Sequence, residues 1–115
     1  MSVQHVLIND STGTIKVSPT TVHASKKNKD EVLWMGTSHF EITFDPISPF
    51  GTDHFDSSPC KTKWSRVNKK GSTARGGYIE CAESGPIDPD AALGEYKYSV
   101  RMGSAVLDPG VHVDP

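Results

Sequence analysis

The sequence predicts an all-β chain that folds as an antiparallel or mixed β-sandwich of about seven or eight short strands. One observation is period-two alternation: Phe40, Ile42 and Phe44 alternate with polar residues until Pro46. This is the pattern of a strand with one buried and one solvated face. Another is turn chemistry, because ten glycines and eight prolines interrupt the apolar runs. A third is that no long segment has helical periodicity.

Length and composition predict one domain spanning residues 1–115. A hydrophobic fraction of 35% and a charged fraction of 23% are ordinary for a soluble globular domain. The net charge of −2 gives no general attraction to nucleic acid or to an anionic membrane. No apolar run is long enough to span a bilayer, and the segment MSVQHVLIND has neither the basic region nor the apolar region of a signal peptide. We therefore expect a cytoplasmic protein, or a periplasmic one if an export signal has been removed.

In the first half, alternating residues predict strands at 4–9, 15–17, 21–24, 32–34 and 40–44. Ser18-Pro19 interrupts the second run, which resumes at Thr21, and in the fourth we expect Leu33 on the solvated face. The segment 45–59 is predicted to be a long ordered loop or a broken edge strand.

In the second half, strands are predicted at 63–67, 77–81 and 95–100. The segment 83–94 is expected to be irregular. Residues 104–107 and 111–113 are expected to close the chain as a final hairpin.

The two cysteines, Cys60 and Cys81, allow two interpretations. They flank the turn-like segment 69–72, so a hairpin centred there would bring them together as a cross-strand disulfide. A cytoplasmic location instead predicts free thiols, and this is the interpretation we favour from sequence.

A family resemblance rests on two segments. The phrase IKVSPTTVHASKKNKDEVLWMGTSHFEITF and the later GEYKYSV resemble the N-terminal half and the penultimate strand of a cupredoxin. The resemblance covers roughly residues 14–46 and 94–114. It implies a Greek-key sandwich of the plastocyanin and azurin type, with immunoglobulin-like topology.

The cupredoxin ligand loop is missing. In the resemblance, Val100 stands where the family has its copper-binding cysteine, and the residues after it include no histidine or cysteine up to residue 110. A type-1 copper site needs that thiolate. The resemblance therefore implies a relative without type-1 copper, and no cofactor is expected. An alternative is a weak, non-blue copper or zinc site that uses His39, the remaining ligand position, and Met102.

No catalytic motif is present. The sequence has no Gly-x-Ser-x-Gly elbow and no His-Glu-x-x-His pair. Asp53, His54 and Asp56 could form an acid–base group, although such residues more often make a solvated turn. We therefore do not expect the protein to be an enzyme.

A basic segment at 61–75 carries six cations and no acid, with Trp64 among them. Basic residues around an aromatic can bind phosphate backbones. A solvated edge strand protected by lysines explains the same pattern. Acidic residues soon afterwards would neutralise the segment, so we do not expect nucleic acid as a partner.

These observations predict a non-catalytic binding module with an unknown protein partner or self-association, including a homodimer. The metal-handling function at His39 is one alternative. Ligand or carbohydrate binding by the 46–59 loop is another, with Phe50, His54 and Phe55 as an aromatic platform. The candidate partner surface comprises Phe50, His54, Phe55, Lys61, Lys63 and Arg66.

Overall fold

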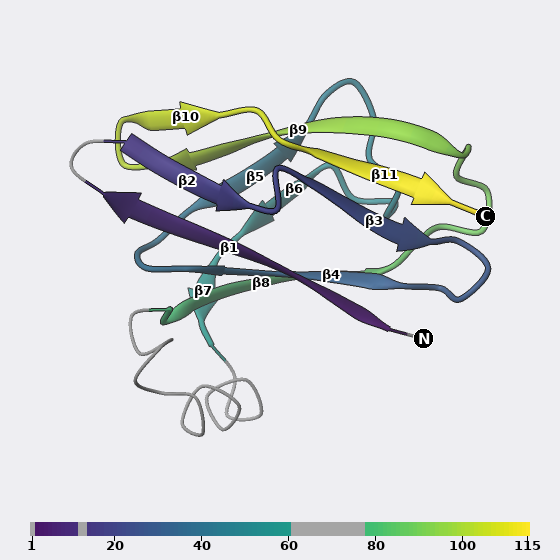
Figure 1. The fold of residues 1–115 in the computed structure, drawn as a ribbon, viewed down its shortest axis with the longest axis horizontal. Helices are drawn as coiled ribbons and strands as arrows, with labels where there is room; N and C mark the ends of the chain where they lie inside the picture. The colour runs from purple at the N-terminus through teal and green to yellow at the C-terminus, as the bar shows by residue number, and fades with distance from the viewer. Residues whose placement is uncertain (1, 12–13, 61–77) are drawn as a thin grey trace.

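The computed structural model describes residues 2–11, 14–60 and 78–115, which form two packed β-sheets (Figure 1). The first sheet has the order β2-β1-β4-β8-β7. Its strands are β1 (Val3–Ser11), β2 (Thr14–Ser18), β4 (Glu31–Gly36), β7 (Ser58–Pro59) and β8 (Glu80–Pro86). The predicted all-β sandwich is confirmed, and no residue that the structure describes is helical.

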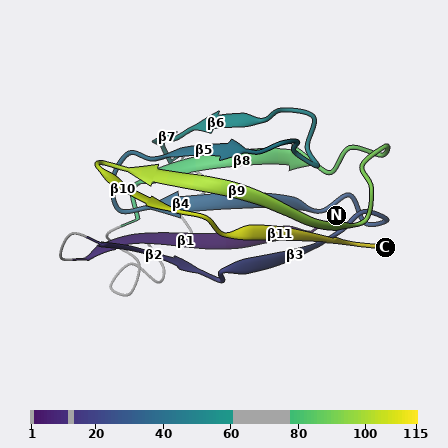
Figure 2. The ribbon, with the colours of Figure 1, turned by 90° about the horizontal axis from the view of Figure 1, so that it is seen from above.

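The second sheet has the order β3-β11-β9-β5-β6, and Figure 2 looks onto it. Its strands are β3 (Thr21–Ser25), β5 (Glu41–Phe44), β6 (His54–Asp56), β9 (Gly94–Met102) and β11 (Gly110–Asp114), with β10 (Ala105–Leu107) paired to β9. Both sheets are mixed, because β1 pairs with β4 and β3 pairs with β11 in parallel.

The core between the sheets is centred on Trp34, which is fully buried on β4. The rings of Phe44, Phe50, Phe55 and Tyr98 surround it, with centroids 5.4 to 6.4 Å from the Trp34 ring. Edge-to-face and tilted aromatic contacts of this kind stabilise a core beyond the area that they bury. The alternation predicted for β5 is confirmed, since Ile42 and Phe44 face this core.

Strand β4 departs from the predicted pattern. Leu33 was expected on a solvated face, yet it is 1% exposed. With Met35 and Cys81 it forms a second apolar cluster on the outer face of the first sheet, covered by Val3, Leu7, Cys60 and Tyr78. Both faces of β4 are therefore buried, which is why its sequence is apolar almost without interruption.

Three other strand predictions need correction. The segment 83–94, expected to be irregular, begins with half of β8, because these residues pair with β4 across a register shift. The predicted closing hairpin is wrong, because β10 and β11 do not pair with each other. Both pair with β9, one after the other along its length, and Asp108-Pro109 separates them. Of the strand predicted at 77–81, Glu80 and Cys81 belong to β8, Tyr78 and Ile79 precede it, and residue 77 lies outside the described residues, as does the strand predicted at 63–67.

The segment 45–59 is a broken edge strand, one of its two predicted forms. Strand β6 pairs with β5 in the second sheet, and β7 pairs with β8 in the first. The short edges that result suit a sandwich that must avoid pairing with other chains. Likewise, the predicted break at Ser18-Pro19 separates β2 in the first sheet from β3 in the second.

Candidate functional site

The two residues of the predicted metal alternative lie in different environments. His39 is exposed in the link between β4 and β5, two residues before β5 begins. Met102 is 4% exposed and belongs to the main core at the end of β9. Among the described residues, His39 is not part of any group of three or more His, Cys, Asp or Glu side chains that could share a metal ion.

The predicted partner surface is only partly present as expected. Phe50 is 8% exposed and packs in the core, so its place in an exposed aromatic platform is wrong. Phe55 is half-buried, with its ring 5.4 Å from that of Trp34, and only His54 is exposed. The rings of Phe50 and Phe55 pack against the buried Trp34 ring and so are not available as an exposed platform. Lys61, Lys63 and Arg66 lie outside the described residues.

The cysteines form a disulfide between Cys60 and Cys81, with Cα atoms 4.9 Å apart. The free-thiol interpretation is therefore wrong and the disulfide alternative is correct, while the hairpin predicted to be centred on 69–72 lies outside the described residues. Strand β7 pairs with β8 immediately before Cys60, and the Cys60 amide donates to the Ile79 carbonyl. This antiparallel pairing brings the two sulfur atoms together.

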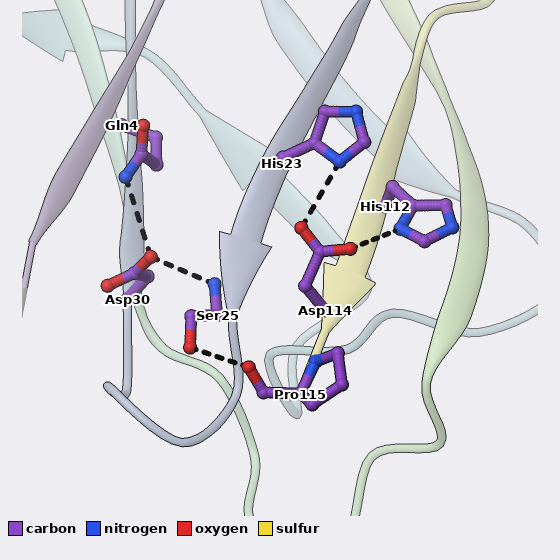
Figure 3. A network of polar contacts seen from close by, with 7 residues as sticks. All are labelled: Gln4, His23, Ser25, Asp30, His112, Asp114 and Pro115. Carbon is purple, nitrogen blue, oxygen red and sulfur yellow. Dashed lines mark hydrogen bonds and ion pairs between the residues drawn. The ribbon is translucent and has the colours of Figure 1, made fainter.

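A histidine–aspartate cluster lies on the outer face of the second sheet (Figure 3). His23 on β3 is directly opposite His112 on β11 in the parallel register. Asp114 follows two residues after His112, so it lies on the same face of β11. The neighbouring residues Val22, Ala24, Val111 and Val113 face the core and are nearly fully buried.

Asp114 is shared by the two imidazoles. Its Oδ1 lies 2.8 Å from His112 Nδ1, and its Oδ2 lies 3.2 Å from His23 Nδ1. The two rings are tilted by 40°, with centroids 5.1 Å apart. Hydrogen bonding from His112, aided by His23, lowers the pKa of the exposed Asp114 carboxyl below its usual value.

A second cluster comprises Glu41 on β5 with His54 and Asp56 on β6. His54 Nε2 lies 3.2 Å from Asp56 Oδ1 and 3.9 Å from Glu41 Oε1. Its Nδ1 lies 3.0 Å from Thr43 Oγ1. The Thr43-His54-Asp56 contacts connect a hydroxyl, a base and an acid, but on an open edge strand that does not exclude water as efficient nucleophilic catalysis requires.

The first cluster is not among the sites predicted from the sequence. His112 and Asp114 carry a local signal, since His112 lies on the strand predicted at 111–113 and Asp114 follows it at the two-residue spacing that places side chains on one face. His23 carries none, because it is 91 residues from Asp114 and meets it only through parallel strand pairing.

A buried carboxylate holds the end of the molecule next to this cluster. Asp30 is 4% exposed and accepts a hydrogen bond from the backbone amide of Ser2. It also accepts hydrogen bonds from the Ser25 amide and from the side chain of Gln4 (Figure 3). These contacts tie the starts of β1 and β4 to the end of β3. The turn between β3 and β4 is thereby fixed.

A groove lies beside that turn, between it and the connection from β8 to β9. We call it the lysine-rimmed groove; it has a volume of about 600 Å³ and is lined by Lys26, Lys27, Lys29, Pro86, Ile87, Pro89, Leu93 and Pro115. Its surface is mostly apolar. Lys26 Nζ donates to the Ala91 carbonyl at 2.6 Å, which links the two sides of the groove.

Comparison with known proteins gives no relative: no family model matches the chain, and no curated protein matches its sequence. Among the described residues there is no helix that is long and apolar enough to cross a membrane.

Proposed function

We propose that the protein is a non-catalytic β-sandwich binding module, cupredoxin-like with Greek-key connections and without type-1 copper, whose lysine-rimmed groove takes a segment of a partner protein. The groove is the observation that carries the proposal. The segment would present a large apolar side chain flanked by acidic residues.

The cupredoxin-like assignment is supported by the positions of the resembling segments. They coincide with β2 to β5 and with β9 to β11, which supply strands to both sheets. Val100, at the position of the family's cysteine ligand, is fully buried in the core. An aliphatic side chain there offers no metal ligand, in agreement with a domain that has kept the sandwich and lost the blue site.

Charge and polarity support the choice of partner. Leu93 is 53% exposed in the groove and offers an apolar side chain to an occupant. Lys27 and Lys29 are exposed at the rim, and no acidic side chain lines the groove among the described residues. Asp88 and Asp90 lie in the same connection but do not line the groove, and Asp88 Oδ1 accepts a hydrogen bond from the Asp90 backbone amide.

The shape of the groove favours a protein segment over a small molecule. Small-molecule sites typically bury most of the ligand surface. This groove is partly open to solvent, so an occupant would keep part of its surface exposed. A segment anchored by its parent protein gains its remaining contacts outside the groove.

The test is selection from a displayed library of random dodecapeptides on the untagged protein. We expect the selected peptides to combine acidic residues with one large apolar residue. Binding of a selected peptide, measured by fluorescence anisotropy, should fall at least about tenfold in Leu93→Asp and in the Lys27→Glu, Lys29→Glu double variant, as for loss of an interface anchor.

The matched controls are Val106→Asp and Lys16→Glu. Val106 is 50% exposed on β10, and Lys16 is exposed on β2, so these substitutions repeat the chemistry away from the groove. Both controls should bind like the wild type. Selection that yields no specific peptide, or peptides that bind the groove variants as well as the controls, would refute the proposal.

We further propose that the protein works in an oxidising compartment, in place of the cytoplasmic location expected from sequence. The support is the Cys60–Cys81 disulfide, because such bonds persist mainly outside the reducing cytosol. Differential alkylation and mass spectrometry of the protein from its native cells would test this. Detection of two alkylated free thiols would contradict this proposal and favour the cytoplasm.

A further inference from the structure

The outer face of the β3–β11 pair carries a set of side chains that neither the binding groove nor the sandwich fold uses. We propose that His23, His112 and Asp114 bind one divalent transition-metal ion, through two imidazole nitrogens and one carboxylate oxygen. This site is distinct from His39 and from the copper position of the family that the chain resembles.

The distances already suit coordination. Ligands at about 2.0 to 2.1 Å from a tetrahedral Zn(II) lie about 3.3 Å from one another. His23 Nδ1 and Asp114 Oδ2 are 3.2 Å apart, and His112 Nδ1 and Asp114 Oδ1 are 2.8 Å apart. One potential ligand atom from each residue falls within 4.8 Å of the other two. The two histidines now contact different oxygens of Asp114, so on binding the side chains would rotate to direct one carboxylate oxygen and both imidazole nitrogens at one ion.

The backbone that carries these ligands is held in place. The pairing of β3 with β11 extends from Gly110–Thr21 to Asp114–Ser25. Beyond it, the Lys26 amide donates to the Asp114 carbonyl at 2.8 Å, and Ser25 Oγ donates to the Pro115 carbonyl at 2.9 Å (Figure 3). Ligands on paired strands lose little freedom on binding, which favours affinity.

The donor set indicates the class of metal. Two imidazoles and one carboxylate suit Zn(II), Co(II), Ni(II) or Cu(II), whereas Mg(II) and Ca(II) prefer sites built of oxygen. The side chains of His23, His112 and Asp114 are 64%, 41% and 41% exposed. Three protein ligands with access to solvent leave a position for water, as in the open zinc sites of proteins.

The test is a Zn(II) titration of the untagged, chelator-treated protein, followed by competition with a chromophoric chelator. Co(II) is titrated in parallel, because its visible spectrum reports the ligand set directly. The variants are His112→Ala and Asp114→Asn. The controls are His39→Ala, which removes the site expected from sequence, and His54→Ala, which disables the second cluster.

We expect one equivalent of Zn(II) to bind, with affinity reduced by more than about tenfold in His112→Ala and in Asp114→Asn. Both controls should bind like the wild type. Thermal unfolding of each metal-free variant should match the wild type, since all these side chains are exposed; this separates loss of a ligand from loss of the fold. The proposal is overturned if no saturable equivalent binds, or if binding is lost in His39→Ala or His54→Ala and kept in His112→Ala.

Discussion

The outer faces of the two sheets are built differently. On the first sheet, Leu33 and Met35 are buried outside the main core, next to the Cys60–Cys81 disulfide. On the second sheet, the outer face carries exposed histidine and carboxylate side chains in two clusters. One outer face is thus covered and cross-linked, and the other is open and carries polar, titratable side chains.

This contrast shows how a small sandwich divides its tasks. A chain of this size has a modest core, so additional burial and a cross-link on the first sheet add stability that the main core alone would lack. The second sheet can then present polar groups without weakening the fold. Substitutions on the first face should therefore change the free energy of unfolding, and those on the second should change binding.

The largest stability effect is expected from removal of the disulfide. The Cys60→Ala, Cys81→Ala double variant should lose about 3 kcal/mol of unfolding free energy, because the bond closes a loop with a sequence separation of 21. Urea denaturation of the variant and the wild type measures this. A loss below about 1 kcal/mol would show that the covered face contributes little.

A loss of unfolding free energy of similar size is expected at high pH, because Tyr98 is buried in the core between the two sheets. Burial raises the pKa of Tyr98 to about 12, and the nearby Trp34 indole N–H offsets this only in part. Within the described chain, neither the Tyr98 hydroxyl nor Trp34 Nε1 makes a hydrogen bond of good geometry.

The sign of this effect follows from which state loses its proton first. The unfolded chain ionises Tyr98 near its ordinary value of 10.0, below the folded value, so stability is complete below pH 10 and falls between pH 10 and about 12. The loss should reach about 2 to 3 kcal/mol. The Tyr98→Phe variant should not show this part of the stability loss at high pH. At pH 7 the substitution should cost little, because the Tyr98 hydroxyl makes no hydrogen bond of good geometry. Urea unfolding of both proteins at pH 7 and pH 11.5 tests it; parallel pH profiles would contradict it.

Truncation within the outer cluster of the first sheet comes next. Leu33→Ala should lower the free energy of unfolding by about 2 kcal/mol, at the low end for a buried leucine because the cluster is small. Exposed Leu93 on the groove provides the matched control, and Leu93→Ala should cost less than about 0.5 kcal/mol. Equal costs for the two leucines would remove the distinction between covered and open faces.

The smallest stability effect is expected on the open face. The His23→Ala, His112→Ala double variant of the metal-free protein should unfold within about 0.5 kcal/mol of the wild type, as exposed ion pairs contribute little. The same urea measurement applies. A loss above about 1 kcal/mol would show that the histidine–aspartate contacts serve the fold.

Much of this architecture was accessible from the sequence, because local patterns determine local structure. Alternation identified β2, β3, β5 and β9, and the break at Ser18-Pro19 marked where the chain changes sheets. The errors have one cause: they depend on pairing between distant segments. Leu33 is buried because β1, β8 and the disulfide cover β4, and β11 extends beside β3 instead of turning back on β10.

The candidate sites were less predictable for the same reason. His39 stood out through its position in a familiar phrase, yet it lies outside both clusters. His23 and His112 become neighbours only when β3, in the first third of the chain, pairs in parallel with β11 in the last third. The groove likewise joins two connections that are about 60 residues apart in the chain.

The most direct measurement is a crystal structure of the untagged protein grown with one equivalent of Zn(II), with anomalous data collected on both sides of the zinc edge. The account predicts a single strong anomalous peak between His23, His112 and Asp114. A peak at His39 or His54 instead, or none at a zinc concentration that saturates binding in solution, would contradict it.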